Sequence, residues 1–301
     1  MLYLFLSKAK KSILMENKII GKKSKTPSTS WSPVAKWYDE TVELEGSYQR
    51  ELILPNLLRL MEIKNDERIL DLACGQGFFS RAFAGAGAEV IGADISKDLI
   101  KIAAEKSEKE ILYHIAPAHS LPFLANQSID KTALVLALQN IEPLEETLKE
   151  CARVLAQNGR LFIVLNHPAF RIPRGSSWGF DEETKTQYRR IDRYLSNSKE
   201  KILMNPGLNA TKERVGSTNS ANEFVLSEEK ETYTFSFHRP LQTYAKALAK
   251  AGFLISRMEE WNSHKKSQPG PRAEAENRAR KEIPLFLAIE ASVSQRPSPK
   301  R

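Results

Sequence analysis

The stretch LDLACGQGFFS, residues 70–80, joins an apolar strand to a helix and begins a regular alternation of the two. It continues a short apolar run, RILDLAC (68–74), and leads into FFSRAFAGAG, which has the composition of a helix that glycines end. Gly75 and Gly77 lie between them, while Ser80 stands where a dinucleotide-binding fingerprint needs a third small residue. The stretch therefore predicts a strand, a shortened glycine turn and a helix.

The same alternation of strand and helix continues as far as residue 167. Amphipathic helices separate the apolar runs, among them KDLIKIAAEKSEKE (97–110) and PLEETLKECARVLA (143–156). Strands that alternate with helices predict a parallel sheet with helices on both faces, a doubly wound α/β fold. Ligands of such sheets bind outside the carboxyl ends of the strands. The five expected strands lie at 68–74, 88–96, 111–118, 131–140 and 159–167.

The segments on either side of this alternation have other patterns. Residues 31–63 carry apolar positions at helical spacing and predict N-terminal helices. After residue 167 the alternation stops for about seventy residues. Two further strands would complete a seven-stranded, mostly parallel sheet. The expected elements of this last part are a helix at 239–253, a strand at 254–261, a polar loop at 262–282 and a final strand at 283–291.

We expect one domain over residues 31–291, between disordered tails at 1–30 and 292–301. Residues 167–238 would form a cap inserted between the fifth strand and the last helix. Within this cap, TYTFSFH (232–238) alternates with a period of two and predicts a strand. QYRRIDRYL (187–195) is consistent with a helix that exposes a charged face, and residues 207–223, which show no period, predict a mobile loop.

The net charge of +8 is concentrated at the two ends of the chain. Seven lysines and one glutamate stand in residues 1–25, and three basic residues come after position 295, so the body between them is close to neutral. A nucleic-acid-binding domain needs excess positive charge on its folded surface, so this distribution disfavours nucleic acid as the main partner. Cys74 and Cys151 offer neither a disulfide framework nor a metal-ligand spacing, and no apolar run approaches the ~20 residues of a membrane span. The simplest expectation is a cytoplasmic protein without a metal.

The glycine turn indicates which charge the ligand carries. Backbone N–H groups at the start of a helix favour an anionic or polar ligand. Asp94 lies nineteen residues after Gly75 and keeps a dinucleotide open, because that fingerprint is followed by an acidic residue at about this distance. Asp71, however, places a carboxylate four residues before Gly75, and a negative charge there repels a pyrophosphate. A ligand with a cationic amino group and a sulfonium fits this charge better.

Five motifs, in order, resemble those of class I S-adenosylmethionine-dependent methyltransferases, of the type found in ubiquinone and menaquinone biosynthesis. ILDLACGQGFFS is similar to the first motif, VIGADIS to the second, AHSLPF and LVLALQNIE to the third and fourth, and CARVLAQNGRLFIVLNH to the fifth-strand signature. The resemblance covers about residues 31–167 and 240–291. It implies a Rossmann-like methyltransferase fold closed by an antiparallel hairpin, S-adenosylmethionine as the cofactor, and methyl transfer as the activity.

The resemblance also implies roles for single residues. Asp71 would neighbour the amino group of the cofactor's methionine end, which Tyr38 would cover. Asp94 would accept hydrogen bonds from both ribose hydroxyls, since a carboxylate has two oxygens. Pro117 replaces an aspartate that many members carry, so the contact to the adenine amino group would fall to the backbone or to His119. The implied cofactor-binding residues are Tyr38, Asp71, Ala73, Gly75, Gly77, Asp94, Ile95, Ala118, His119, Leu138 and Gln139.

The methyl acceptor has to be read from the segment added to the common fold. Methyl transfer from a sulfonium mainly needs alignment and exclusion of water, so the motifs identify the cofactor better than the acceptor. His167 and His238 stand at the two ends of the cap and would accept a proton from an attacking oxygen or nitrogen. A structural hydrogen bond is the alternative for either histidine. The expected substrate-binding residues are Arg171, Arg174, Trp178 and Arg239, with Phe170, Phe180 and Tyr188 as an apolar wall.

We expect the acceptor to be a small molecule that offers an oxygen, nitrogen or carbon nucleophile. The motif NPPY or DPPY, which in similar enzymes accompanies methylation of exocyclic amino groups, is absent from the chain. Three alternatives stay open: a methyltransferase that acts on RNA with the lysine-rich end as a tether, an NAD(P)-dependent oxidoreductase, and a non-catalytic adenosylmethionine-binding protein.

Overall fold

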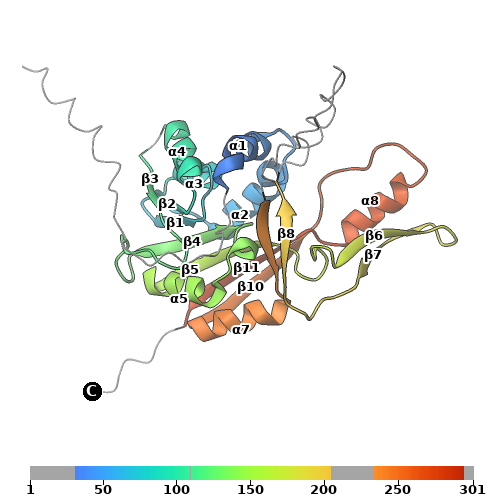
Figure 1. The fold of residues 1–301 in the computed structure, drawn as a ribbon. Coiled ribbons are helices and arrows are strands. Elements are labelled where there is room, and N and C mark those ends of the chain that lie inside the picture. Colours follow the sequence, from blue (N-terminus) through green and yellow to red (C-terminus); the bar gives the residue numbers. More distant parts are fainter. Residues whose placement is uncertain (1–30, 109, 205–232, 295–301) are drawn as a thin grey trace, which may run out of the picture.

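The computed structural model describes residues 31–108, 110–204 and 233–294, arranged as Figure 1 shows. The predictions for the tail at 1–30, the loop at 207–223 and the residues after 294 lie outside the described residues. Among the described helices, none is long and apolar enough to cross a membrane.

A single seven-stranded sheet forms the centre of the fold. Its strands are β1 (Arg68–Leu72), β2 (Glu89–Asp94), β3 (Leu112–Ile115), β4 (Ile129–Val135), β5 (Leu155–Asn166), β10 (Phe253–Trp261) and β11 (Phe286–Val293). They lie in the order β10-β11-β5-β4-β1-β2-β3. Neighbours from β5 to β3 run parallel, whereas β11 runs antiparallel to both β5 and β10. The predicted doubly wound, mostly parallel sheet is therefore confirmed.

Helices cover both faces of this sheet, as the alternation of strands and helices predicts. Short turns η1 (Ser32–Val34), η2 (Gln49–Ile53) and η3 (Leu138–Asn140) accompany helices α1 (Ala35–Glu43), α2 (Leu54–Met61), α3 (Phe78–Gly85), α4 (Lys97–Lys106), α5 (Leu144–Val154), α7 (Leu241–Ala251) and α8 (Ala273–Glu282). In Figure 1, α5 and α7 lie on one face, and α2 and α3 on the other. The N-terminal helices expected at 31–63 are also confirmed.

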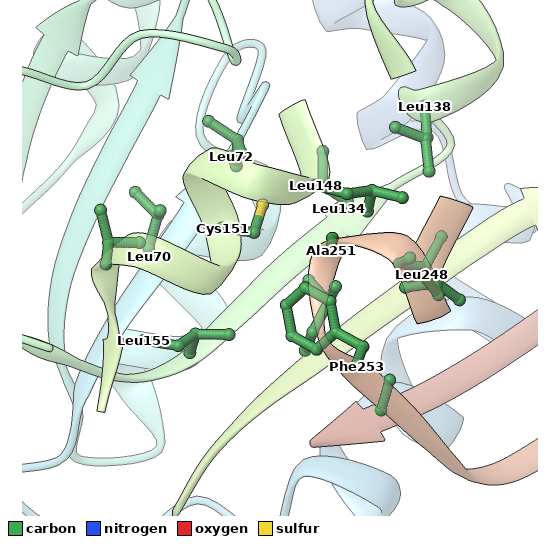
Figure 2. Packing of buried hydrophobic residues seen from close by; sticks show 14 of the residues in the cluster. Leu70, Leu72, Leu134, Leu138, Leu148, Cys151, Leu155, Leu248, Ala251 and Phe253 are labelled. Atoms are coloured by element: carbon green, nitrogen blue, oxygen red, sulfur yellow. The ribbon is translucent and has the colours of Figure 1, made fainter. Parts of the chain in front are cut away.

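The core consists of one apolar layer on each face of the sheet. Successive side chains of a strand point to opposite faces. Accordingly, Leu70 packs with α5 and α7, while Ile69 packs with α2 and α3. Figure 2 shows the first layer, in which Leu148 and Cys151 of α5 and Leu248 of α7 belong to one apolar cluster. Burying both faces keeps the strands in place, so the ends of β1, β2 and β4 are held rigidly where a ligand would lie.

Four strands of the segment 167–238 lie outside the main sheet. β6 (Ser176–Asp181) pairs antiparallel with β7 (Thr186–Ile191), and β8 (Ser198–Leu203) pairs antiparallel with β9 (Tyr233–His238). The strand predicted at 232–238 is confirmed as β9. The helix interpretation of 187–195 is wrong, because most of this stretch is β7 and the segment after it. Its arginines alternate between the two faces of a hairpin instead of lying on a helical face.

The last part of the chain differs from the predictions in two places. The polar loop expected at 262–282 contains α8, whose only buried residues are Ala275 and Ala279. Acidic residues in its first turn, basic residues in its last turn and glutamate–arginine pairs four residues apart stabilise such a polar helix without an apolar stripe. The final strand, expected at 283–291, runs instead from Phe286 to Val293, so it includes two residues assigned to the tail.

Candidate functional site

A cavity of about 390 Å³ opens at the carboxyl ends of β1, β2 and β4. We call it the Asp94 cavity. Its size lies in the range of small-molecule sites. Seven of the implied cofactor-binding residues line it: Tyr38, Ala73, Gly75, Asp94, Ile95, Ala118 and His119. The described lining residues include two carboxylates, Asp94 and Glu142, but neither a lysine nor an arginine. The cavity therefore favours a neutral or cationic ligand over a pyrophosphate.

Asp94 ties the end of β2 to the glycine turn. Its Oδ2 accepts a hydrogen bond from the backbone N–H of Gly75 at 3.0 Å, and its Oδ1 accepts one from Ser96 at 2.8 Å. Burial raises the pKa of this carboxyl above its ordinary value, and these backbone N–H groups act in the opposite direction. Each oxygen keeps a further lone pair, so Asp94 can accept two more hydrogen bonds from a ligand with neighbouring hydroxyls.

The backbone at the strand ends adopts conformations that side chains rarely take. Gly75 has φ +57° and Gly77 φ +80°, and two non-glycine residues, Ala73 (φ +57°) and Leu136 (φ +53°), share this left-handed region. Ala73 comes directly after β1 and Leu136 directly after β4, and both line the Asp94 cavity. Such strained residues cluster at ligand sites, where the surrounding structure maintains them.

Gly77 does not line the cavity and has a packing role. A Cβ at this position would lie 2.5 Å from the hydroxyl oxygen of Tyr113 on β3. The absence of a side chain therefore lets α3 begin close to β3. Leu138 and Gln139 are likewise behind the wall: Leu138 is buried in the core, and Gln139 Nε2 donates a hydrogen bond to the carbonyl of Leu136 at 2.7 Å. Gly77, Leu138 and Gln139, which were predicted to contact the cofactor, lie behind the residues that line the cavity.

Asp71 is also buried behind the cavity instead of lining it. Ser80, at the position of a third glycine, donates a hydrogen bond from Oγ to Asp71 Oδ2 at 2.5 Å. Burial, with a contribution from the neighbouring Asp94, raises the pKa of Asp71 to about 7, although the hydrogen bond from Ser80 opposes the shift. The two carboxyl groups add negative potential beneath the turn when they are ionised.

Tyr38 of α1 closes the cavity over the glycine turn. A Cβ at Gly75 would lie 3.3 Å from Cε1 of Tyr38, so the ring rests against the turn. Trp31 packs edge-on against it, with 5.2 Å between ring centroids. Burial and then the charges of Asp94 and Asp71 raise the pKa of the Tyr38 hydroxyl, which therefore stays protonated and available as a donor.

The opposite wall consists of residues that were not among the implied cofactor-binding residues, although three of them end the motif LVLALQNIE. Asn140, Ile141, Glu142 and Pro143 lie at and just after the end of η3, and Phe235 comes from β9, ninety-five residues after Asn140. Asn140 Nδ2 donates a hydrogen bond to the carbonyl of Phe235 at 2.8 Å and joins these segments. The alternation of TYTFSFH predicts a strand with Phe235 on an aromatic face, but contains no signal for the cavity that this face would meet.

His167 does not line the Asp94 cavity. Its side chain is buried, Nδ1 accepts a hydrogen bond from the backbone N–H of Ala169 at 3.2 Å, and Nε2 contacts Glu260 Oε1 at 2.6 Å. Because Nδ1 is an acceptor, Nε2 carries the hydrogen and donates to the carboxylate. Burial lowers the pKa of the ring. Both ring nitrogens take part in hydrogen bonds within the protein, and the role of His167 as a proton acceptor stays a prediction.

His238 and Arg239, predicted to act in catalysis and substrate binding, also form hydrogen bonds within the protein. His238 Nε2 donates a hydrogen bond to the carbonyl of Tyr194 at 2.7 Å. The guanidinium of Arg239 is buried and donates to the carbonyls of Leu138, Ile141 and Glu142 at 3.3, 2.8 and 2.9 Å. Arg239 therefore holds the wall next to η3, while neither side chain lines the Asp94 cavity.

The remaining predicted substrate residues separate into two groups. Arg171 and Trp178 line a second cavity, together with Phe170, at the far part of the same sheet edge. Arg174 lines neither cavity, because its exposed side chain turns toward Glu200, with 3.8 Å between Nη1 and Oε2. Of the expected apolar wall, Phe180 packs under Arg272 and Tyr188 is exposed on β7.

Fold and site together define an α/β protein of the doubly wound class with a ligand cavity at the strand ends. Residues 70–163 match the family model described as a methyltransferase domain. It is 30% identical over 142 residues to a demethylmenaquinone methyltransferase of Paenarthrobacter aurescens, an alignment that covers 47% of this chain and 55% of the relative. It is 31% identical over 149 residues to an uncharacterized methyltransferase, YcgJ, of Bacillus subtilis, covering 48% and 56%. The chain thus spans about half the length of these curated relatives.

A solved structure supports the same fold over a larger part of the chain. An S-adenosylmethionine-dependent methyltransferase from Mesorhizobium loti superimposes with a TM-score of 0.58 at 24% sequence identity. The match covers 79% of this chain and 96% of that one. At this identity the likeness shows a common fold, which is the Rossmann-like methyltransferase fold implied by the motifs.

Proposed function

We propose that this chain transfers a methyl group from S-adenosylmethionine to a small-molecule acceptor. The observation that carries the proposal is the Asp94 cavity: a carboxylate with two free lone pairs beside a left-handed glycine turn, in a cavity without a lysine or arginine among its described lining residues. Two carboxyl groups near that turn favour a ligand with positive charge, as a sulfonium and an amino group provide.

We assign three parts of the cavity to three parts of the cofactor. Asp94 would accept hydrogen bonds from the ribose hydroxyls, and Ile95 with Ala118 and His119 would enclose the adenine. Gly75 would allow the backbone to approach the methionine end under Tyr38. Asp71, Gly77, Leu138 and Gln139, which the motifs placed in contact with the cofactor, would instead hold these groups in position from behind.

When bound, S-adenosylmethionine supplies a methyl group on a positively charged sulfur. The protein then has to orient the acceptor in line with that bond and keep water away. Tyr38 and Trp31 would close the cavity on one side, and Phe235 with the wall next to η3 on the other. These apolar walls suit a small organic acceptor. A relative named a demethylmenaquinone methyltransferase supports the same class of acceptor.

The NAD(P)-dependent oxidoreductase is less consistent with these observations. A pyrophosphate would meet the charges of Asp94 and Asp71 with no lysine or arginine among the described lining residues to offset them. The antiparallel strand β11 and the match to a methyltransferase domain also support methyl transfer. The cytoplasm stays the expected compartment, and RNA stays the alternative acceptor.

Calorimetry with the full chain tests the cofactor, and isotope transfer tests the acceptor. We expect S-adenosylhomocysteine to bind and NADH to release no heat; preferential binding of NADH would contradict the proposal. The protein is then incubated with methyl-labelled S-adenosylmethionine and with separated metabolite, RNA and protein fractions of a cell extract. Label in the metabolite fraction supports a small-molecule acceptor, whereas label in RNA alone would replace it with the RNA alternative. Binding without any transfer would indicate the non-catalytic alternative.

A further inference from the structure

A second cavity, of about 500 Å³, lies at the same edge of the sheet as the Asp94 cavity. We call it the arginine cavity. The ends of three neighbouring strands lie beside it: Phe286 of β11 pairs with Asn166 of β5 and with Trp261 of β10. Residues that follow β5 and β10 and residues that precede β11 line the cavity. The hairpin β6–β7 and α8 enclose it, and these elements lie side by side in Figure 1. The two cavities have no described lining residue in common, so a ligand in one leaves the other free.

Positive charge in the arginine cavity exceeds negative charge. Arg171, Arg189 and Arg280 line it, and the only carboxylate among its described lining residues is Glu276, which pairs with Arg280 at 3.9 Å. Arg189 Nε donates a hydrogen bond to the carbonyl of Phe170 at 2.7 Å, which fixes its guanidinium in the cavity wall. Two positive groups are therefore held here without a carboxylate of their own.

Arg171 is the least satisfied of these groups. Its guanidinium lies 5.8 Å from the ring centroid of Phe286 and forms no ion pair with a described carboxylate. Burial lowers the pKa of Arg171, and both burial and the charge of Arg171 lower the pKa of Arg189. Arg171 lines the cavity and is exposed, so its guanidinium is available to donate paired hydrogen bonds to a planar oxyanion.

Aromatic side chains form the rest of the wall. Trp178 of β6 is 42% exposed, although its ring faces the cavity, and Arg189 stacks on it with 5.2 Å between Cζ and the ring centroid. Phe170 and Tyr48 line the same space. An exposed tryptophan beside the fixed guanidinium of Arg189 offers a planar ligand both a stacking surface and a charge partner.

We propose that the arginine cavity binds a small organic acid, with its carboxylate or phosphate at Arg171 and Arg189 and its ring against Trp178 and Phe170. The fork of donors on a guanidinium matches the two oxygens of either group. This site is separate from the Asp94 cavity, and its ligand can bind at the same time as the cofactor. The inference does not depend on the proposed function, because the described lining residues of the two cavities are different.

Titration of the full chain with benzoate and with phenyl phosphate tests this site, and benzyl alcohol serves as the uncharged control. Calorimetry and the fluorescence of Trp178, identified by comparison with Trp178→Phe, measure the binding. We expect at least one of the two anions to saturate the site and benzyl alcohol not to bind. The two anions distinguish a carboxylate from a phosphate ligand. Absence of binding by both would overturn the proposal.

Matched variants locate the anion. Arg171→Met keeps the apolar stem and removes the charge, so we expect binding about tenfold or more weaker, the effect of losing hydrogen bonds to a charged group. Arg174→Met, three residues on and outside the cavity, should bind like the unchanged chain. Equal weakening in both variants would indicate non-specific attraction and refute the site. A circular-dichroism spectrum and a thermal unfolding midpoint like those of the unchanged chain show that Arg171→Met is folded. If it is not folded, Trp178→Leu takes its place with the same expectation.

Discussion

The Asp94 cavity and the arginine cavity open at one edge of one sheet, yet their charges are opposite in sign. The first is formed mainly by turns directly after β1, β2 and β4, with carboxyl groups in and beneath it. The second is assembled from the residues around η2, the β6–β7 hairpin, α8 and the approach to β11, and three arginines line it. The common fold thus supplies the negative site locally, whereas the added segments bring the positive site together.

The largest expected effect concerns Asp71, which lies beneath the negatively charged Asp94 cavity. Its folded pKa of about 7 exceeds the ordinary value of 3.8, so the free energy of unfolding falls as the pH rises from about 4 to about 7. Asp71→Asn removes this titration and still accepts the hydrogen bond from Ser80. We expect the variant to be more stable than the unchanged chain above pH 7, by up to about 4 kcal/mol, with no gain at pH 4. Urea unfolding of the ligand-free protein at both pH values measures this.

A contrary result for Asp71 would be a constant difference in unfolding free energy at all pH values. That outcome would mean that the carboxyl ionises in the folded protein at little cost and that burial does not raise its pKa. Asp98→Asn, an exposed aspartate of α4, is the control and should leave the pH profile unchanged.

Asp94→Asn should distinguish the two cavities most directly. An amide nitrogen cannot accept a hydrogen bond, so the variant loses either the hydrogen bond from one backbone N–H or the hydrogen bond from one ligand hydroxyl. It also loses the negative charge. We expect the affinity for S-adenosylhomocysteine to fall about 100-fold, while binding of the anion probe in the arginine cavity is unchanged. Calorimetry with each ligand checks both. If both affinities fell together, the cavities would be coupled and the comparison would fail.

Gly77→Ala tests whether the glycine turn is a packing device rather than a ligand contact. The added Cβ would meet the Tyr113 hydroxyl at 2.5 Å in a conformation with φ +80°. We expect a loss of about 2 kcal/mol of unfolding free energy from this overlap and strain. Gly85→Ala, at the end of the same helix and with nothing within 4 Å, is the matched control and should be neutral or slightly stabilising. Thermal unfolding compares the two, and equal effects would remove the packing role.

Arg239→Met should produce the smallest of these effects. The change leaves the carbonyls of Leu138, Ile141 and Glu142 without their donor, so the wall of the Asp94 cavity loosens from behind. We expect about tenfold weaker binding of S-adenosylhomocysteine. Arg257→Met, on the exposed strand β10, is the control. Unchanged cofactor affinity in Arg239→Met would return this arginine to the candidates for a direct substrate contact.

Much of the fold could be predicted from local pattern. Apolar runs and helical spacing predicted the five parallel strands and the helices between them, because side-chain direction repeats every two or 3.6 residues. Polar α8 escaped this reasoning, since its stability comes from charge pairs and helix-end charges instead of an apolar stripe. The stretch 187–195 was predicted to be a helix with a charged face. A short polar hairpin lacks the alternation of apolar residues by which a strand is recognised in a sequence.

The sequence by itself determined the negative site: Asp71, the glycine turn and Asp94 lie at strand ends, and the topology of a parallel sheet brings those ends to one edge. It could not show which hydrogen-bond partners the nitrogens of His167, His238 and Arg239 meet, because only the tertiary structure brings those partners together. It also could not join Tyr48, Arg171, Arg189 and Arg280 into one cavity. Residues so far apart in the chain meet through packing, and packing leaves no period in the sequence.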